Sequence, residues 1–257
     1  MTEHLFRRTG HELVDRQFGS TAAAYVASAV HAAGADLDRI ALRAQEARPQ
    51  HAFDLGAGGG HAGYAMAPHA RNVTACDISP RMLEAISAEA NRRGLNNIAP
   101  QAAAAEALPF PDGSFDFLAC RFSAHHWRQV QTGLREARRV LAPGAPAMFI
   151  DVVAPAAPAA DTHLQAVELL RDGSHVRDYS AAQWLAMLEN AGFSVDRLTT
   201  GRLRMDFADW TARMRTPPAL AAAIRALQNA ASDEVAAHFE IEPDGSFTID
   251  TLLVEAF

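Results

Sequence analysis

The sequence predicts an α/β fold in which a mostly parallel sheet carries helices on both faces. Short apolar segments alternate with segments of helical periodicity between residues 51 and 153. Glycine and proline clusters separate these segments, as expected for turns between elements. A length of 257 residues, with 49% apolar and 21% charged residues, suits one globular domain with a substantial core.

The segment from 51 to 153 is expected to contain five strands joined by helices. The helix after the second strand has the clearest boundaries. Ser79 suits its N-cap, Pro80 its first position and Gly94 its end. Another helix is expected over 130–141, where apolar residues recur at helical spacing. The expected strands cover residues 51–55, 72–77, 97–103, 114–120 and 145–153, of which the third has the weakest pattern.

Helical periodicity also covers residues 11–47, and a Pro/Ala-rich linker follows the fifth strand at 154–160. Further elements are expected beyond this linker: helices near 162–171 and 180–191, strands over 193–203 and 247–257, and a mostly helical insertion at about 206–240. The prediction is therefore one domain over 1–257 with seven strands in all. Its parts are an N-terminal helical lid (1–50), a core (51–153) and a C-terminal half (154–257) whose insertion also serves as a lid.

The composition excludes several classes of function. A formal net charge of −7, without a long basic run, argues against nucleic acid as a partner. All 23 basic residues are arginines, so chemistry that needs a lysine amine is excluded. Cys76 and Cys120 lie in apolar strand-like segments and are expected to be reduced. No segment resembles a signal peptide or a membrane span, so a cytoplasmic protein is expected.

The sharpest motif follows the first strand, where Asp54-Leu-Gly56-Ala-Gly58-Gly-Gly60 precedes a helix. Glycines there let the backbone turn sharply and approach a ligand closely, next to the free N–H groups of the helix N-terminus. Asp77 ends the second strand, where a carboxylate can accept hydrogen bonds from ribose hydroxyls. The pattern predicts an adenosine-type ligand. It leaves open a nicotinamide dinucleotide, because Gly58–Gly63 also fits the dinucleotide fingerprint.

Four motifs in order resemble one known family. They are the Asp54–Gly60 glycine motif, Asp77-Ile-Ser-Pro-Arg-Met, Ala105-Glu106-Ala-Leu-Pro-Phe-Pro-Asp-Gly-Ser-Phe-Asp116 and Arg138-Arg-Val-Leu-Ala-Pro-Gly144. This series resembles the class I S-adenosylmethionine (SAM)-dependent methyltransferases of the ubiquinone/menaquinone-biosynthesis-like group. Segments such as Ala124-His-His-Trp127 are similar to a narrower bacterial subgroup. The resemblance implies a Rossmann-like fold. It also implies methyl transfer from SAM to a small molecule, with S-adenosylhomocysteine (SAH) as the product.

The resemblance also implies a role for each matched position. Asp54 and Gly56 are expected to hold the methionine end of SAM, and Asp77 the ribose hydroxyls. Ile78 and Met82 are expected to pack on the adenine. The full set expected to bind SAM is Phe18, Tyr25, Asp54, Gly56, Ala57, Gly58, Gly60, Asp77, Ile78, Met82, Ala105, Glu106, Arg121 and Phe122.

Ala104 departs from the family pattern, because many members carry an acid there that accepts a hydrogen bond from the adenine amino group. Losing one such bond costs roughly 0.5–1.5 kcal/mol, which is too little to abolish binding. It does leave open a non-catalytic SAM- or SAH-binding protein. The other alternative, an NAD(P)-dependent oxidoreductase, rests on the glycine fingerprint alone and lacks a recognisable hydride-transfer set.

His125 and His126 follow the fourth strand, at the edge where ligands bind in such sheets. An imidazole pKa near 6.5 lets either act as a general base; otherwise one packs beside Trp127 and the other is solvated. No metal is expected. Arg177, Trp210 and Arg213 lie outside the core and are predicted to bind the acceptor, expected to be an anionic or phenolic small molecule. The sequence leaves a homodimer open.

Overall fold

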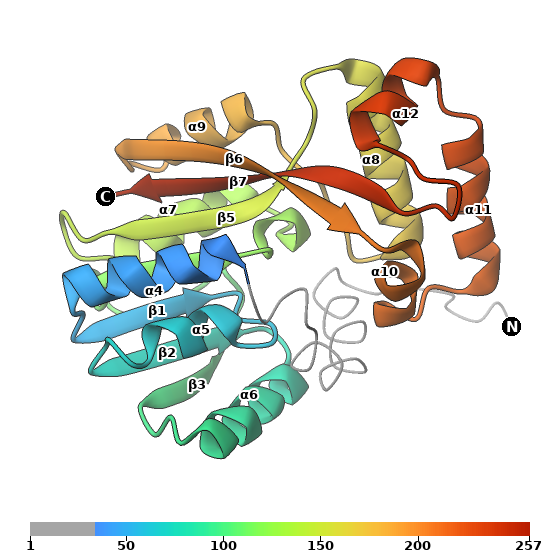
Figure 1. Cartoon of the computed structure of the whole chain (residues 1–257). Coiled ribbons are helices and arrows are strands. Elements are labelled where there is room, and N and C mark those ends of the chain that lie inside the picture. Colours follow the sequence, from blue (N-terminus) through green and yellow to red (C-terminus); the bar gives the residue numbers. More distant parts are fainter. Residues whose placement is uncertain (1–33) are drawn as a thin grey trace, which may run out of the picture.

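The computed structural model describes residues 34–257, which form a seven-stranded sheet in the order β3-β2-β1-β4-β5-β7-β6 (Figure 1). Strands β1 to β5 pair in parallel, and β7 runs antiparallel to both of its neighbours, β5 and β6. Six of the seven strands therefore share one direction. This confirms the predicted fold class. The strands are β1 His51–Leu55, β2 Asn72–Asp77, β3 Ile98–Ala102, β4 Phe117–Arg121, β5 Ala147–Val153, β6 Val195–Met205 and β7 Phe247–Ala256.

The helices between these strands begin and end largely where turn residues predict. The helix after β2 starts with Pro80 and ends at Gly94, which has a φ of 72°. Ser79 stands at its N-cap position, but the hydroxyl makes no capping hydrogen bond. The helices are α4 Ala35–Ala47, α5 His61–Met66, α6 Pro80–Arg93, the short 3₁₀ turn η1 Ala124–His126, α7 Val130–Val140, α8 Pro158–Arg171, α9 Ala181–Asn190, α10 Phe207–Arg213, α11 Pro218–Asn229 and α12 Asp233–Phe239.

Both faces of the sheet are covered by helices. Neighbouring residues of a strand point to opposite faces, so each strand contributes side chains to both buried layers. Ala52 packs with residues of α4 and α5, whereas Phe53 packs on the other face with residues of α7 and α9. Met148 and Phe149 of β5 divide in the same way. The helices α4, α5 and α6 therefore cover one face, and α7 and α9 cover the other (Figure 1).

Two details refine the predicted strands. The third strand lies at the sheet edge, where Pro100 is tolerated because an edge position leaves one side of the backbone unpaired. The fourth begins at Phe117 instead of Ser114, since Asp116 bends away to cap the first strand. Its carboxylate accepts the backbone N–H groups of Gln50 and His51, at 2.8 and 2.9 Å.

The C-terminal helices build a second packed unit at one end of the sheet. β7 pairs with β5 from Asp250 onward, while Phe247–Ile249 extend past it and pair with β6 alone. Phe247 and Ile249 pack with residues of α8, α10, α11 and α12, including Trp210 (Figure 1). The expected insertion at 206–240 is thus helical. Among residues 34–257, none of the helices combines the length and apolar character that crossing a membrane demands.

Candidate active site

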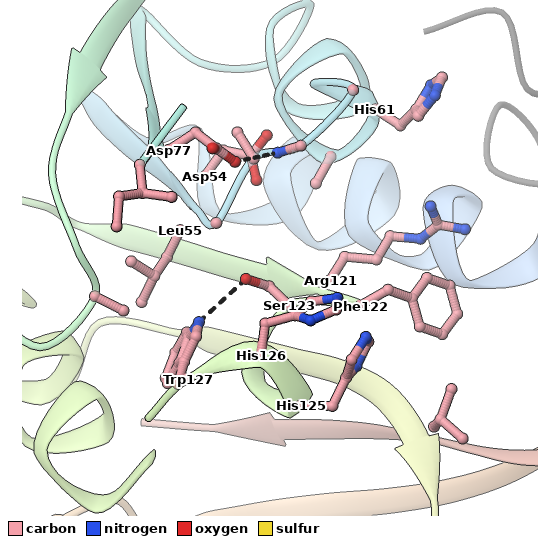
Figure 2. A pocket seen from close by; sticks show the side chains of 18 of the residues that line it. Asp54, Leu55, His61, Asp77, Arg121, Phe122, Ser123, His125, His126 and Trp127 are labelled. Carbon is pink, nitrogen blue, oxygen red and sulfur yellow. Dashed lines mark hydrogen bonds between the residues drawn. The ribbon is translucent and has the colours of Figure 1, made fainter. Parts of the chain in front are cut away.

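A cavity opens at the carboxyl ends of β1 and β4, where the strand order reverses direction and ligands bind in open α/β sheets. Figure 2 shows Asp54 and Asp77 on one side of it and His125 and His126 on the other. Its walls come from the loops after β1, β2, β3 and β4, and from α8, β6 and α10. One continuous cavity therefore joins the glycine loop after β1 to the C-terminal helical unit.

The glycine loop needs backbone conformations that other residues adopt poorly. Gly56, Gly58 and Gly60 have φ values of 70°, 51° and 79°. A Cβ on Gly56 would lie 1.9 Å from Oγ of Ser123, so the loop after β4 packs directly on the glycine. A Cβ on Gly58 would meet no described protein atom within 4 Å, although the residue lines the cavity. The loop thus leaves space at Gly58 for a ligand to lie against bare backbone.

Asp77 ties this loop to the start of α6. Its Oδ2 accepts the N–H of Gly58 at 2.8 Å, and its Oδ1 accepts the N–H of Ser79 at 2.9 Å. Both oxygens are fixed by backbone donors, and the residue lines the cavity beside Ile78. A carboxylate held in this way has further acceptor capacity for a pair of hydroxyls, so the site fits the ribose of an adenosine.

Asp54 is the next-to-last residue of β1, beneath the loop, with 1% of its surface exposed. Its Oδ2 accepts the N–H of Gly63 at 2.7 Å. Burial raises the pKa of Asp54 to about 7; the hydrogen bond from Gly63 and the charge of Arg121 act in the opposite direction, while Asp77 adds to the rise. A cationic group arriving in the cavity would favour the ionised carboxylate, so Asp54 suits the ammonium end of a ligand.

The two candidate bases differ in their surroundings. His125 donates through Nδ1 to Oδ1 of Asp151 at 2.5 Å. Burial alone lowers the pKa of His125, but the charge and hydrogen bond of Asp151 outweigh it and raise the pKa to about 9. Burial and the neighbouring charge of His125 lower the pKa of His126 to about 4. Near neutral pH His125 is therefore protonated and His126 is neutral, and His125 becomes able to accept a proton as the pH approaches 9.

The far end of the cavity is lined by an apolar wall and several charged groups. The wall consists of Phe122, Val152, Leu203, Met205 and Trp210. The charged groups there are Glu168, Arg171, Asp178 and Arg213. Arg171 already bonds to Glu168 at 3.3 Å and stacks over the ring of Trp210, so much of its charge is compensated within the protein.

Most predicted site residues meet at this cavity. Phe18 and Tyr25 lie outside the described residues. Gly60, Met82 and Arg177 do not line the cavity, and Arg177 pairs with Asp161 at 2.7 Å. The predicted site residues that line the cavity are Asp54, Gly56, Ala57, Gly58, Asp77, Ile78, Ala105, Glu106, Arg121, Phe122, His125, His126, Trp210 and Arg213.

Sequence reasoning missed several residues here. Asp151 carries a usable signal, because it is an acid within the otherwise apolar strand β5. Ser123 lies between two predicted positions and accepts the indole N–H of Trp127 at 3.1 Å. Glu168 and Asp178 give no local signal, since a helix and a loop far along the chain deliver them to the cavity.

Fold and site together define an α/β protein that binds an adenosine-type ligand at the reversal point of its sheet. The family described as "Methyltransferase domain" (Methyltransf_11) matches residues 53–149. The chain is 46% identical over 184 residues to the uncharacterized protein YafE of Escherichia coli (strain K12), an overlap of 72% of this chain and 89% of YafE. It is 34% identical over 218 residues to the uncharacterized methyltransferase YcgJ of Bacillus subtilis (strain 168), covering 84% of this chain and 86% of YcgJ.

The solved structure of YcgJ superposes with a TM-score of 0.82 at 31% identity, over 86% of this chain and 97% of that one. The chain belongs to the class I SAM-dependent methyltransferases. SAM is accordingly its cofactor, and the dinucleotide-dependent alternative is set aside. The glycine loop, Asp54 and Asp77 fit this cofactor by the chemistry described above.

Proposed function

We propose that this chain transfers the methyl group of SAM to a small-molecule acceptor and releases SAH. The observation that carries the proposal is the continuity of the cavity. The same space is lined by Asp77 and Gly58 at one end and by Trp210 and Arg213 at the other. A protein that only binds SAM needs no second chamber beyond the cofactor, whereas a transferase needs both ligands in one cavity, aligned for direct displacement.

The cofactor end holds SAM through three kinds of contact. Asp77 accepts the ribose hydroxyls, Asp54 pairs with the ammonium group, and the bare backbone at Gly58 allows close approach. Ile78 and Ala105 give the adenine an apolar surface. SAM supplies a methyl group on positively charged sulfur, so the protein's task is to position the acceptor and exclude water.

The acceptor end favours a molecule with an apolar body. Five apolar side chains line it, and two of them, Phe122 and Trp210, are aromatic. The attraction of this end for an anion is weaker than the sequence predicted. Arg177 lies outside the cavity lining, and the charge of Arg171 is paired with Glu168. Of the two acceptor types predicted, this arrangement supports a phenolic molecule more than a strongly anionic one.

We place the whole of residues 1–257 in a single domain, in which α10 closes the acceptor end. Trp210 and Arg213 of α10 line the cavity, while α11 and α12 pack on α8 behind it. Within the described residues 206–240, only α10 reaches the cavity. The lid of the insertion is thus one short helix supported by two others.

Calorimetry with purified protein tests the cofactor step: SAM and SAH are expected to bind, and NAD is not. Asp77→Ala is expected to weaken SAM binding by at least about tenfold, since it removes charge-assisted hydrogen bonds. The exposed Asp233→Ala serves as a matched control. Transfer is then tested by incubating the protein with methyl-labelled SAM and a metabolite extract, followed by mass spectrometry. Binding of SAM without any labelled product in repeated extracts would favour the non-catalytic alternative.

A further inference from the structure

His125 and Asp151 form an ordered pair at the wall of the cavity (Figure 2 shows His125 with its ring at this wall). Asp151 is 1% exposed, and its Oδ1 also accepts the N–H of Val152 at 2.9 Å. The backbone of His125 is held as well, since its carbonyl accepts the N–H groups of Val176 and Arg177. Both the position and the ring orientation of His125 are therefore fixed.

The remaining ring nitrogen is left for a ligand. The Nδ1 atom is occupied by Asp151, and within residues 34–257 the ring of His125 makes no other hydrogen bond. The side chain keeps 15% of its surface exposed and lines the cavity. Nε2 is thus the atom that a bound acceptor meets, as in other sites where a carboxylate orients an imidazole.

A metal ion is a poorer occupant of this cluster than a proton. His125, Asp151 and Asp178 each bring a ligand-type atom within 4.8 Å of the others. However, Nδ1 of His125 lies 2.5 Å from Oδ1 of Asp151, the separation of a short hydrogen bond. Two ligands of tetrahedral zinc, each at about 2.0–2.1 Å from the metal, lie about 3.3 Å apart.

The titratable groups around His125 come from four elements. They are Asp151 on β5, Glu168 on α8, Asp178 and His175 on the loop after α8, and His126 on the same 3₁₀ turn. Burial lowers the pKa of His175 to about 2 and that of His126 to about 4, so both rings are neutral near pH 7. Burial also raises the pKa of Asp178. Among the three histidines, only His125 exchanges a proton with a ligand in the working range.

The surroundings also select the acceptor's chemistry. An ammonium group would meet a second cation in protonated His125, although Asp151, Asp178 and Glu168 offset part of that charge. A neutral hydroxyl meets no such penalty. The apolar wall formed by Phe122, Trp210 and their neighbours accommodates an aromatic ring. The pKa of a phenol is about 10 and that of His125 is about 9, so the two values are close enough for efficient proton transfer.

We propose that His125, oriented by Asp151, accepts the proton of a phenol-type hydroxyl on the acceptor, whose oxygen then receives the methyl group. The O–H bond breaks and its proton passes to Nε2. The oxygen forms a bond to the methyl carbon, while the carbon–sulfur bond breaks and its electron pair stays on sulfur. The imidazolium afterwards returns the proton to solvent. Asp151 is a positioning residue, and the inference rests on the proposed function.

The first test needs no acceptor and no cofactor. The imidazole of His125 is titrated by NMR in the full-length protein and in Asp151→Asn, whose side chain keeps its shape. A pKa near 9 is expected in the wild type, falling below 6.5 in the variant, because burial then acts without the carboxylate. Asp250→Asn is the matched control: it removes the acid 3.0 Å from His238, outside the cavity lining, and is expected to leave His125 unchanged. A wild-type pKa below 7, or one that Asp151→Asn does not move, overturns the inference.

The second test uses methyl-labelled SAM with a panel of simple phenols, anilines and carbon acceptors. Labelled aryl methyl ethers are expected, with a rate that rises about tenfold per pH unit from pH 7 to about 9. His125→Gln is expected to lower kcat at least about 100-fold, with KM and SAM affinity little changed. This variant also keeps the test valid if Asp151→Asn does not fold. Methylation confined to nitrogen or carbon, or full activity in His125→Gln, refutes the inference but leaves the proposed function intact. Failure to bind SAM refutes the proposed function itself.

Discussion

The carboxylate of Asp54 accepts the N–H of Gly63 at 2.7 Å in a pocket where almost none of Asp54 is exposed. A single backbone donor does not compensate fully for burial, so the pKa of the acid stands at about 7 against an ordinary value near 4. The folded chain therefore binds a proton between about pH 4 and 7 that the unfolded chain releases. This lowers the free energy of unfolding of the ligand-free protein as pH rises through that window.

The same relationship predicts a pH-dependent affinity for SAM. Because the ammonium group of SAM needs an ionised partner, its Kd is expected to rise about tenfold for each pH unit below 7. Asp54→Asn is expected to bind SAM more weakly at pH 8 and to lose the pH dependence. Calorimetry at pH 5 to 8, in buffers of different ionisation enthalpy, measures both affinity and proton release. A Kd that stays constant in the wild type over this range contradicts the assigned role of Asp54.

Gly58→Ala is expected to separate ligand binding from folding. Gly58 and Gly94 both have left-handed φ values, and a Cβ on either would meet no described atom within 4 Å. Alanine at each position is therefore expected to cost a similar free energy of unfolding, about 1–2 kcal/mol. Only Gly58 lines the cavity, so only Gly58→Ala is expected to weaken SAM binding. Chemical denaturation and calorimetry on both variants check this, and equal SAM affinities in the two would refute it.

The elements of the fold were predictable because their signals are local. Proline after a serine, and glycine at Gly94, mark the ends of α6, and two-sided burial gives β5 its apolar run. The sequence predicted the start of β4 three residues too early. In the structure β4 begins only at Phe117, because Asp116 accepts the backbone N–H groups of Gln50 and His51. Such a long-range contact leaves no periodic signal in the sequence.

The cofactor end of the site was more predictable than the acceptor end. Asp54 and Asp77 lie at the carboxyl ends of the neighbouring strands β1 and β2, and Gly58 follows β1, so parallel pairing brings the three together. The pairing of Arg121 with Ile150 likewise places Asp151 one residue further, near His125. Assigning that pair requires the register of β4 and β5, which sequence patterns do not fix. The groups from α8 and α10 depend on tertiary packing alone.

Arg213 and Arg177 offer a comparison at the acceptor end. Both were predicted to bind the acceptor, but Arg213 lines the cavity whereas Arg177 bonds to Asp161 at 2.7 Å outside it. Arg213→Gln is expected to raise the KM for the acceptor about tenfold or more, because it removes a charge-assisted hydrogen bond. The affinity for SAM is expected to stay unchanged. Arg177→Gln is expected to change KM by less than about twofold. Steady-state kinetics with a confirmed acceptor measures both, and a larger effect of Arg177→Gln would show that the acceptor site extends beyond the described cavity.

Ala104→Asp is expected to strengthen SAM binding. Ala104 lines the cavity between Ala103 and Ala105, in the position where the sequence lacks an acid for the adenine amino group. A new carboxylate there can accept that hydrogen bond, which is worth about 0.5–1.5 kcal/mol, or roughly 2- to 10-fold in Kd. Ala107→Asp adds the same charge at an exposed position outside the lining, so it separates the hydrogen bond from a general electrostatic effect on the cationic cofactor. Calorimetry with SAM and SAH on both variants provides the measurement. Equal gains in the two would attribute the change to charge alone, and no gain in Ala104→Asp would mean that the adenine does not lie beside Ala104.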